Sequence, residues 1–295
     1  MCISRLLLNS CKKCKSYDEL KLVIHQYKYQ LFYGRDKYDN LLLWACLTNL
    51  PLVALEILKY PDRCDMTQID TNGNTSLVVA CRNRIQRVAL EILKHPDKCR
   101  IDQINHDGDT ALLLACSNGM KNVASELLKH PDKCRIDHID RDGYTALMMA
   151  CVSGMDNVAL ELLKHPDKCK IGSIGYDGYT ALIWACMNEM EKVALELLKH
   201  PDKCKINRVD SHGYTALIWA CFNEMENVAL ELLKHPSKCN MGHINYNDCV
   251  ALTYARGNKL TSVVKEMLKY PALCRPRHTP RQYYPVRCCQ KDKTD

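Results

Sequence analysis

Cysteine and histidine are the residues of this chain whose types and spacing could do chemistry. The 295 residues include 19 cysteines and 11 histidines, and a histidine repeatedly stands four positions before a cysteine, as in His165 and Cys169. Zinc sites use these two side chains, but a structural site needs four ligands, and each copy of the motif supplies two. Cysteine thiols can also serve redox chemistry. A metal- or redox-responsive protein is therefore one hypothesis that the composition raises.

An internal repeat places most of these cysteines. The motif KHPDKC recurs every 35 residues, and looser copies extend the series at both ends. A period of this length indicates a solenoid, in which each unit buries its apolar face against its neighbours. The copies end at Cys64, Cys99, Cys134, Cys169, Cys204, Cys239 and Cys274.

The repeat also limits what the cysteines can do together. Equivalent positions in adjacent units are expected about 10 Å apart, which is one helix spacing. That separation is too large for a shared zinc ion, and a disulfide needs Cα atoms within about 7 Å. We therefore interpret these cysteines as framework residues and predict no metal site and no cofactor.

Residues 178–204, GYTALIWACMNEMEKVALELLKHPDKC, show how one unit is built. After a glycine turn, Thr180 is a suitable N-cap for a short helix that is apolar on all sides. A second, amphipathic helix is predicted from about Glu191 to Lys199, and Pro201 ends it because proline cannot continue the hydrogen-bond ladder. Each unit is thus predicted to be a helix, a turn, a second helix and a long polar loop.

This pattern resembles the ankyrin repeat. The family's line of a glycine turn, TPLH, two small residues and a Val-x-x-Leu-Leu helix reads here as GYTALIWAC followed by VALELL. The resemblance covers nearly the whole chain, and it implies an all-α solenoid of stacked helix-turn-helix units with hairpin-like loops. The turn glycine recurs at Gly73, Gly108, Gly143, Gly178 and Gly213.

The chain departs from the family's pattern at three points. Alanine replaces the proline that starts the first helix, as at Ala181, and an apolar residue replaces the histidine, as at Ile183. The hydrogen bonds between repeats that the family draws from that histidine are therefore in question. Two extra loop residues lengthen the usual period of about 33 residues. This HPDKC-type variant resembles the arrays of giant DNA viruses of amoebae.

Three segments are predicted along the chain. Residues 1–37 align with the later units but carry polar substitutions, as expected of a degenerate N-terminal capping unit. Residues 38–274 are predicted to form seven ankyrin-like repeats, of which the last is a C-terminal cap. Residues 275–295 are basic and rich in proline, so they are predicted to be a disordered tail.

The basic excess of the chain belongs to its ends. The formal charge is +7, but residues 1–40 and 275–295 each carry +4, which leaves −1 for residues 41–274. Weak nucleic-acid binding by the basic termini is therefore an alternative function, although nucleic acid is not the expected partner. No stretch is long and apolar enough for a bilayer span or a signal peptide. We expect a soluble, intracellular protein with no membrane partner.

Catalysis has no support in the sequence. The chain contains no GxSxG, Walker, HExxH or GxGxxG motif. Acidic residues and histidines recur with the period instead of gathering in one unit. We predict that the protein is not an enzyme and has no catalytic residue and no small-molecule substrate.

The family resemblance implies where a protein partner would bind. In ankyrin arrays the partner surface is usually the concave face, built from turn tips and the exposed edge of the first helix. At these positions the C-terminal half of the chain is rich in Tyr, Met and Phe, which are enriched at interface cores. The predicted partner-binding residues are Arg141, Tyr144, Tyr176, Tyr179, Met187, His212, Tyr214 and Phe222.

The predicted function is a non-enzymatic scaffold that binds an unidentified protein partner. Trp44, Trp184 and Trp219, on the first helices, are predicted to be packing residues. If the origin is viral, the partner would be a host protein and the location the host cytoplasm.

Overall fold

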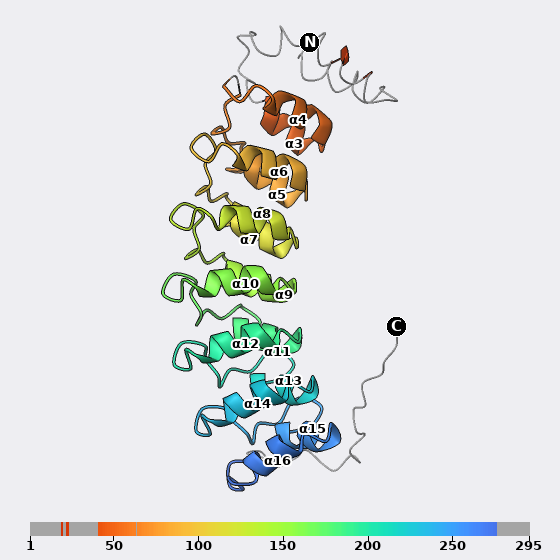
Figure 1. Ribbon diagram of the computed structural model, residues 1–295, viewed down its shortest axis with the longest axis vertical. Coiled ribbons are helices and arrows are strands. Elements are labelled where there is room, and N and C mark those ends of the chain that lie inside the picture. The colour runs from red at the N-terminus through yellow and green to blue at the C-terminus, as the bar shows by residue number, and fades with distance from the viewer. Residues whose placement is uncertain (1–18, 20–21, 24–40, 63, 276–295) are drawn as a thin grey trace. The chain divides into compact units, whose positions relative to one another are not determined.

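The computed structural model describes residues 19, 22–23, 41–62 and 64–275. Within these residues the regular structure is helical throughout, so the predicted all-α repeat fold is confirmed (Figure 1). The chain divides between Arg141 and Asp142 into two compact units, called unit 1 and unit 2 below.

Unit 1 contains three helix pairs in its described part. In each pair a first helix packs against a second, and the first helices also pack side by side, as do the second helices, which makes two layers. The pairs are α3 Leu41–Leu47 with α4 Pro51–Leu58, α5 Ser76–Arg82 with α6 Gln86–Leu93, and α7 Ala111–Ser117 with α8 Lys121–Leu127.

Unit 2 contains four helix pairs in its described part, arranged in the same two layers. The pairs are α9 Ala146–Val152 with α10 Asp156–Leu163, α11 Ala181–Met187 with α12 Glu191–Leu198, α13 Ala216–Phe222 with α14 Glu226–Leu233, and α15 Ala251–Gly257 with α16 Thr261–Met267.

A threonine cap starts most of the first helices, as predicted. The Thr180 hydroxyl accepts a hydrogen bond of 3.2 Å from the backbone N–H of Ile183 and so satisfies a donor that the first helical turn leaves open. In α15 the N-cap residue is Val250, which has no capping side chain. The other threonine caps are Thr75, Thr110, Thr145 and Thr215.

The core lies between the two helix layers. On α12 the side chains of Val193, Ala194, Leu197 and Leu198 are buried, which is the spacing of an amphipathic helix with one apolar face. The first helices are buried on most sides, as their uniformly apolar sequences predict. Burial of these faces against neighbouring repeats is the main stabilising contribution, because no single helix pair has a core of its own.

After five of the described first helices, an asparagine takes the place of the family's histidine as the link to the preceding repeat. Asn223 donates from Nδ2 to the backbone oxygen of Cys186 at 2.9 Å and to that of Met187 at 3.0 Å. These carbonyls belong to the last turn of α11, which has no helical partner for them. Asn83, Asn118, Asn188 and Asn258 make the equivalent bond.

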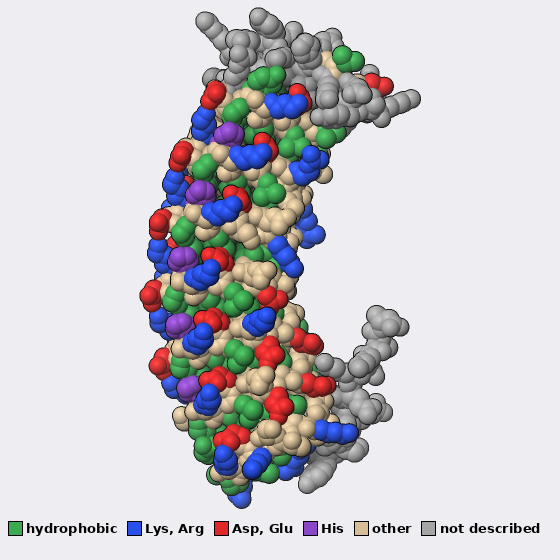
Figure 2. Space-filling model, in the orientation of Figure 1, with side chains coloured by type: hydrophobic (Ala, Val, Ile, Leu, Met, Phe, Trp, Pro, Cys, Tyr) green, Lys and Arg blue, Asp and Glu red, His purple; other side chains and the backbone are tan. Residues whose placement is uncertain are grey.

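The HPDKC loops carry ion pairs that join each repeat to the one before it. Lys203 Nζ lies 2.7 Å from Asp167 Oδ1, and both side chains are exposed, so each pair contributes little to stability. The series ends where serine replaces the aspartate at Ser237 and leucine replaces the lysine at Leu273. Within each unit these charged loops form one edge, which also carries the histidines (Figure 2). The further pairs are Lys98 with Asp62, Lys133 with Asp97, and Lys238 with Asp202.

The loop between repeats narrows into a hairpin-like turn before each first helix. Isolated antiparallel bridges join Ile104 to Thr110 and Val209 to Thr215 across two of these turns. The predicted capping unit 1–37 lies outside the described residues apart from three positions, and so does the predicted tail beyond Arg275.

Candidate functional site

Aromatic side chains stack along the first helices of unit 2. Tyr179 follows the turn glycine and lies on the indole ring of Trp184, with ring centroids 4.1 Å apart and planes 18° apart. Tyr214 lies on Trp219 in the same way, at 4.4 Å. In each pair the tyrosine directly precedes the N-cap threonine, and its ring lies over the tryptophan in the middle of the short helix.

The second of these pairs belongs to a cluster of four rings. Phe222, at the end of α13, meets Trp219 at 5.6 Å and Tyr254 of α15 at 5.4 Å, both edge to face. Tyr214 completes the cluster, 6.2 Å from Tyr254. Edge-to-face and stacked geometries are the favourable arrangements of aromatic pairs, so these rings hold one another in place.

Hydrogen bonds fix the tyrosines from the other side. The hydroxyl of Tyr144 donates to Asp177 at 2.7 Å, and Tyr214 accepts from the Asn247 side chain at 2.8 Å. The Tyr179 hydroxyl lies 3.0 Å from Nδ1 of His212. Each tyrosine thus reaches the turn tip of the following repeat.

The two tryptophans differ in their polar contacts. Trp219 Nε1 donates to Asp210 Oδ2 at 2.8 Å. The position of Asp210 is taken by Gly175 one repeat earlier, and Trp184 Nε1 is buried with no hydrogen-bond partner among the described residues. A Cβ atom at Gly175 would lie 2.8 Å from the Tyr144 ring, so Tyr144 occupies the space that the aspartate fills elsewhere.

The structure places the predicted contact residues at different depths. Tyr176 is 80% exposed at a turn tip, and His212 is also exposed, while Tyr144, Met187 and Phe222 are half-buried. Arg141 is exposed at the last turn tip of unit 1.

Tyr179 and Tyr214 are only 4% and 8% exposed. For these two residues the structure supports packing against tryptophan in place of direct partner contact. Burial is the main cause that raises the pKa of Tyr179 above its ordinary value. Removal of the Tyr179 and Tyr214 side chains would therefore disturb the fold as well as the surface.

Four half-buried side chains remain on the surface of α11 and α13, and we call them the aromatic face: Trp184, Met187, Trp219 and Phe222. The sequence identified Met187 and Phe222 as contacts and both tryptophans as packing residues. The tryptophans do pack, but each keeps part of its indole ring at the surface. Tyr254 could not be singled out from the sequence, because its partner rings lie 32 or more positions earlier in the chain.

Acidic residues border the aromatic face. The turns after α11 and α13 both read Asn-Glu-Met-Glu, which places Glu189 and Glu191, and then Glu224 and Glu226, next to the last residue of each first helix. Glu191 accepts a hydrogen bond of 2.8 Å from Asn227. Figure 2 shows acidic side chains gathered on the α11–α14 part of unit 2, away from the histidine-bearing edge. We call these four glutamates the acidic rim.

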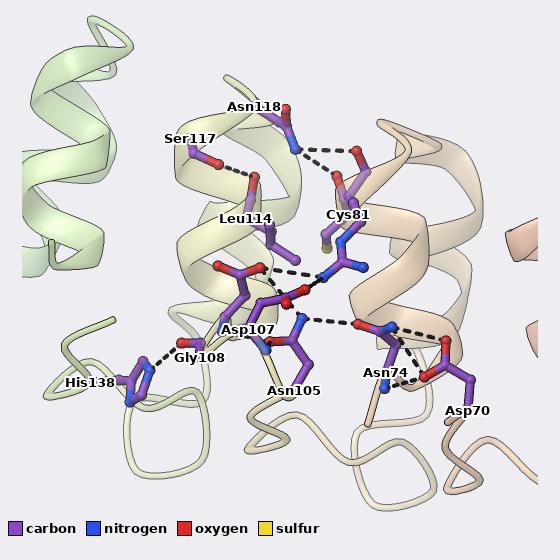
Figure 3. Close-up of polar contacts among 12 residues, drawn as sticks. Asp70, Asn74, Cys81, Asn105, Asp107, Gly108, Leu114, Ser117, Asn118 and His138 are labelled. Carbon is purple, nitrogen blue, oxygen red and sulfur yellow. Dashed lines mark hydrogen bonds and ion pairs between the residues drawn. The ribbon is translucent and has the colours of Figure 1, made fainter. Parts of the chain in front are cut away.

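The turn tips of unit 1 are polar at the positions that hold tyrosines in unit 2. Asn74 donates to Asp70 at 2.9 Å and accepts from Asn105 at 2.9 Å, so the side chains bond in a row from one tip to the next (Figure 3). Arg82 closes this network through an ion pair of 2.9 Å with Asp107. The polar side chains of these tips are hydrogen-bonded to one another, and they offer no aromatic surface.

The cysteines are placed for packing. Of the 14 described cysteines, Cys64 is half-buried and the other 13 are buried, and no disulfide joins any of these 14. Burial raises the pKa of Cys46 to about 12 and that of Cys99 to about 11, which disfavours the reactive thiolate. Within the described residues, His, Cys, Asp and Glu side chains nowhere form a group of three that could hold a metal ion. This geometry gives no support to the metal or redox alternative.

None of the helices in the described part of the chain combines the length and apolarity needed to cross a lipid bilayer.

Two layers of short helix pairs, joined by hairpin-like turns and by side-chain hydrogen bonds from repeat to repeat, define a helical-repeat protein. The sequence matches the family described as ankyrin repeats in three copies, over residues 87–174 and 166–248, which together span more than half of the chain. The chain therefore belongs to the ankyrin-repeat family. A comparison with curated proteins finds no match.

Two solved structures resemble this chain at low sequence identity. The ankyrin-repeat domain of Bcl-3, a member of the IkappaB protein family, is 19% identical, with a TM-score of 0.50 over 78% of this chain and 100% of that one. A chain from the structure of the Bd0816 predatory endopeptidase of Bdellovibrio bacteriovorus in complex with immunity protein Bd3460 is 22% identical. That match has a TM-score of 0.48 and covers 69% of this chain and 100% of that one.

Proposed function

We propose that the protein is a scaffold that binds a partner protein through the aromatic face of unit 2 and performs no chemistry on it. The observation that carries this proposal is that Trp184, Met187, Trp219 and Phe222 remain half-exposed on two neighbouring first helices. Tryptophan is the side chain most typical of interface hot spots, and Phe and Met are enriched at interface cores.

The packing behind the aromatic face favours binding. Tyr179 and Tyr214 stack beneath the two indole rings, and Tyr254 holds Phe222 from the adjacent helix. Side chains that are already held in one orientation lose little rotamer entropy when a partner arrives, so more of the contact energy contributes to affinity.

The fold itself does not require large apolar groups at the positions of Met187 and Phe222. The position of Phe222 is occupied by Leu47, Arg82, Ser117 and Val152 in other repeats of the same chain. The buried residues of the same helices change much less from repeat to repeat. Met187 and Phe222 are therefore free to serve recognition.

A photo-crosslinking experiment tests the proposal. The photoreactive residue benzoylphenylalanine is placed at position 187 or 222 of the aromatic face, or at position 47, which is the equivalent of position 222 in the first described repeat. The proposal predicts that the same protein is crosslinked from both 187 and 222 in the native cell and not from 47. Equal yields from all three positions would contradict it.

The proposal extends to origin and location. The HPDKC-type repeat resembles the arrays of giant DNA viruses of amoebae, so the partner we expect is a host protein, met in the host cytoplasm. Recovery of the crosslinked partner and its identification by mass spectrometry test this part separately.

A further inference from the structure

We infer that the segment bound by unit 2 is basic and carries a bulky apolar side chain, so that its cationic groups meet the acidic rim while its apolar group rests on the aromatic face. This inference rests on the proposed function and specifies the chemistry of the partner.

The apolar half of the inference comes from the aromatic face. Trp219 and Phe222 meet edge to face, and both remain partly exposed, as do Trp184 and Met187 on the preceding first helix. The ring faces also carry partial negative charge, which attracts Lys and Arg groups as well as apolar ones.

The basic half comes from charge complementarity. Glu189 and Glu224 are exposed and follow Met187 and Phe222 by two residues, so each carboxylate stands at the end of a helix that carries aromatic residues. Glu191 and Glu226 begin the second helices beside them, and the adjacent basic residue is Lys192, the second residue of α12. A cationic segment that crosses the ends of α11 and α13 is therefore attracted, and an anionic one is repelled.

The position of Glu191 and Glu226 is also acidic at Asp156, but a glutamate at the position of Glu189 and Glu224 occurs, among residues 41–275, only in the two repeats that carry the aromatic face. The residues equivalent to Glu189 and Glu224 are Asn49, Arg84 and Gly119 in unit 1, and Gly154 and Lys259 elsewhere in unit 2. The fold accepts glycine, cationic and anionic residues at this position, so the glutamates are not required by the turn. They occur in the two repeats whose first helices carry Trp184 and Trp219, whereas Asn49 follows α3, which carries Trp44.

The same comparison supplies variants that keep the fold. Glu189 and Glu224 have φ angles of 57° and 59°, and Gly119 and Gly154 have 67° and 59° at the same turn position. Glu189→Gly with Glu224→Gly therefore removes two rim charges in a backbone conformation that glycine already adopts in this chain. Asn49→Gly with Arg84→Gly makes the matched change in unit 1, where φ is 54° and 57°.

The test measures binding of three fluorescein-labelled synthetic peptides to the full-length protein. In the first, lysine and arginine alternate with leucine and phenylalanine. The second keeps the basic residues and replaces the apolar ones with glycine, and the third keeps the apolar residues and replaces the basic ones with glutamate. Fluorescence anisotropy at physiological ionic strength gives each Kd.

We expect the first peptide to bind most tightly. The Glu189→Gly/Glu224→Gly variant should bind it about tenfold more weakly, because two exposed charge pairs are lost. The Asn49→Gly/Arg84→Gly variant should bind it as the unaltered protein does. Equal binding of the first peptide to both glycine variants, or equal affinity for all three peptides, would overturn the inference.

Two further outcomes separate this inference from the proposed function. If a native protein is crosslinked from positions 187 and 222 but its capture is unchanged by Glu189→Gly/Glu224→Gly, the proposed function holds and the inference fails. If a peptide with the sequence of residues 276–295 displaces the first peptide, the aromatic face and acidic rim bind the chain's own basic C-terminal segment. The inference of a separate basic partner is then overturned.

Discussion

Trp219 donates its indole N–H to the carboxylate of Asp210, whereas Trp184, one repeat earlier, has no such acceptor because Gly175 stands at the position equivalent to Asp210. Asp210 is buried and also accepts the backbone N–H groups of His212 and Tyr214, at 2.9 and 2.8 Å. One carboxylate therefore holds both the turn tip and the tryptophan above it.

Replacement of Asp210 by alanine should lower the free energy of unfolding by about 2–3 kcal/mol, because buried N–H donors lose their acceptor. Asp210→Asn should cost less, about 1–2 kcal/mol, because an amide oxygen can still accept the backbone bonds but the amide NH2 group cannot accept from Trp219. Asn105 accepts the same two backbone bonds at the equivalent position. Urea unfolding followed by circular dichroism measures both. Equal stability of the alanine variant and the unaltered protein would show that Asp210 does not organise the turn.

Replacement of Asn223 by alanine should cost about 1–2 kcal/mol, because the carbonyls of Cys186 and Met187 lose a shared donor. Serine is the natural control, since Ser153 stands at the same position in another repeat. If Asn223→Ala and Asn223→Ser unfold at the urea concentration of the unaltered protein, asparagine does not link the repeats.

Replacement of Glu224 by glycine should raise the free energy of unfolding by about 0.5–1 kcal/mol, because its φ of 59° is unfavourable for a residue with a Cβ atom. The reciprocal change, Gly154→Glu, should lower it by a similar amount, and a Cβ atom there meets nothing within 4 Å, so only the backbone is tested. Thermal unfolding of both variants measures the effect, and a shift in the same direction for both would refute the explanation.

The buried thiols should make the protein sensitive to alkali. Burial raises the pKa of Cys186, Cys151 and Cys221 well above the ordinary value of 9.0. Below about pH 8 these thiols are essentially neutral in both the folded and the unfolded state. Above it they ionise in the unfolded chain first, so the stability they contribute is lost as the pH rises towards the folded-state pKa.

Each such thiol should add roughly 1 kcal/mol per pH unit to the loss of stability between about pH 9 and 11. Guanidinium unfolding across this range measures the slope, and the Cys151→Ala/Cys186→Ala variant should show a shallower one. An identical slope for that variant would mean that these thiols are not buried as described.

The sequence allowed the repeat architecture to be predicted because the local signals agree. Thr180 was predicted to be an N-cap, and it caps α11. The second helix begins at Glu191, as expected. The burial of Tyr179 was not predictable, because its depth depends on contacts with Trp184 and His212 that only the folded turn creates. The role of Asn223 was missed because its acceptor lies one repeat away, and repetition alone does not show which copied side chains bond.

The central claim is that Met187 and Phe222 bind the partner, and one affinity measurement tests it most directly. With the crosslinked partner purified, its Kd is measured for the unaltered protein, for Met187→Ser/Phe222→Ser and for Leu47→Ser. Serine already stands at the equivalent position, at Ser117, so the fold should tolerate each change. The account predicts a loss of at least about tenfold for the double variant, as expected for two interface anchors, and no change for Leu47→Ser. Equal affinity of all three proteins would contradict it.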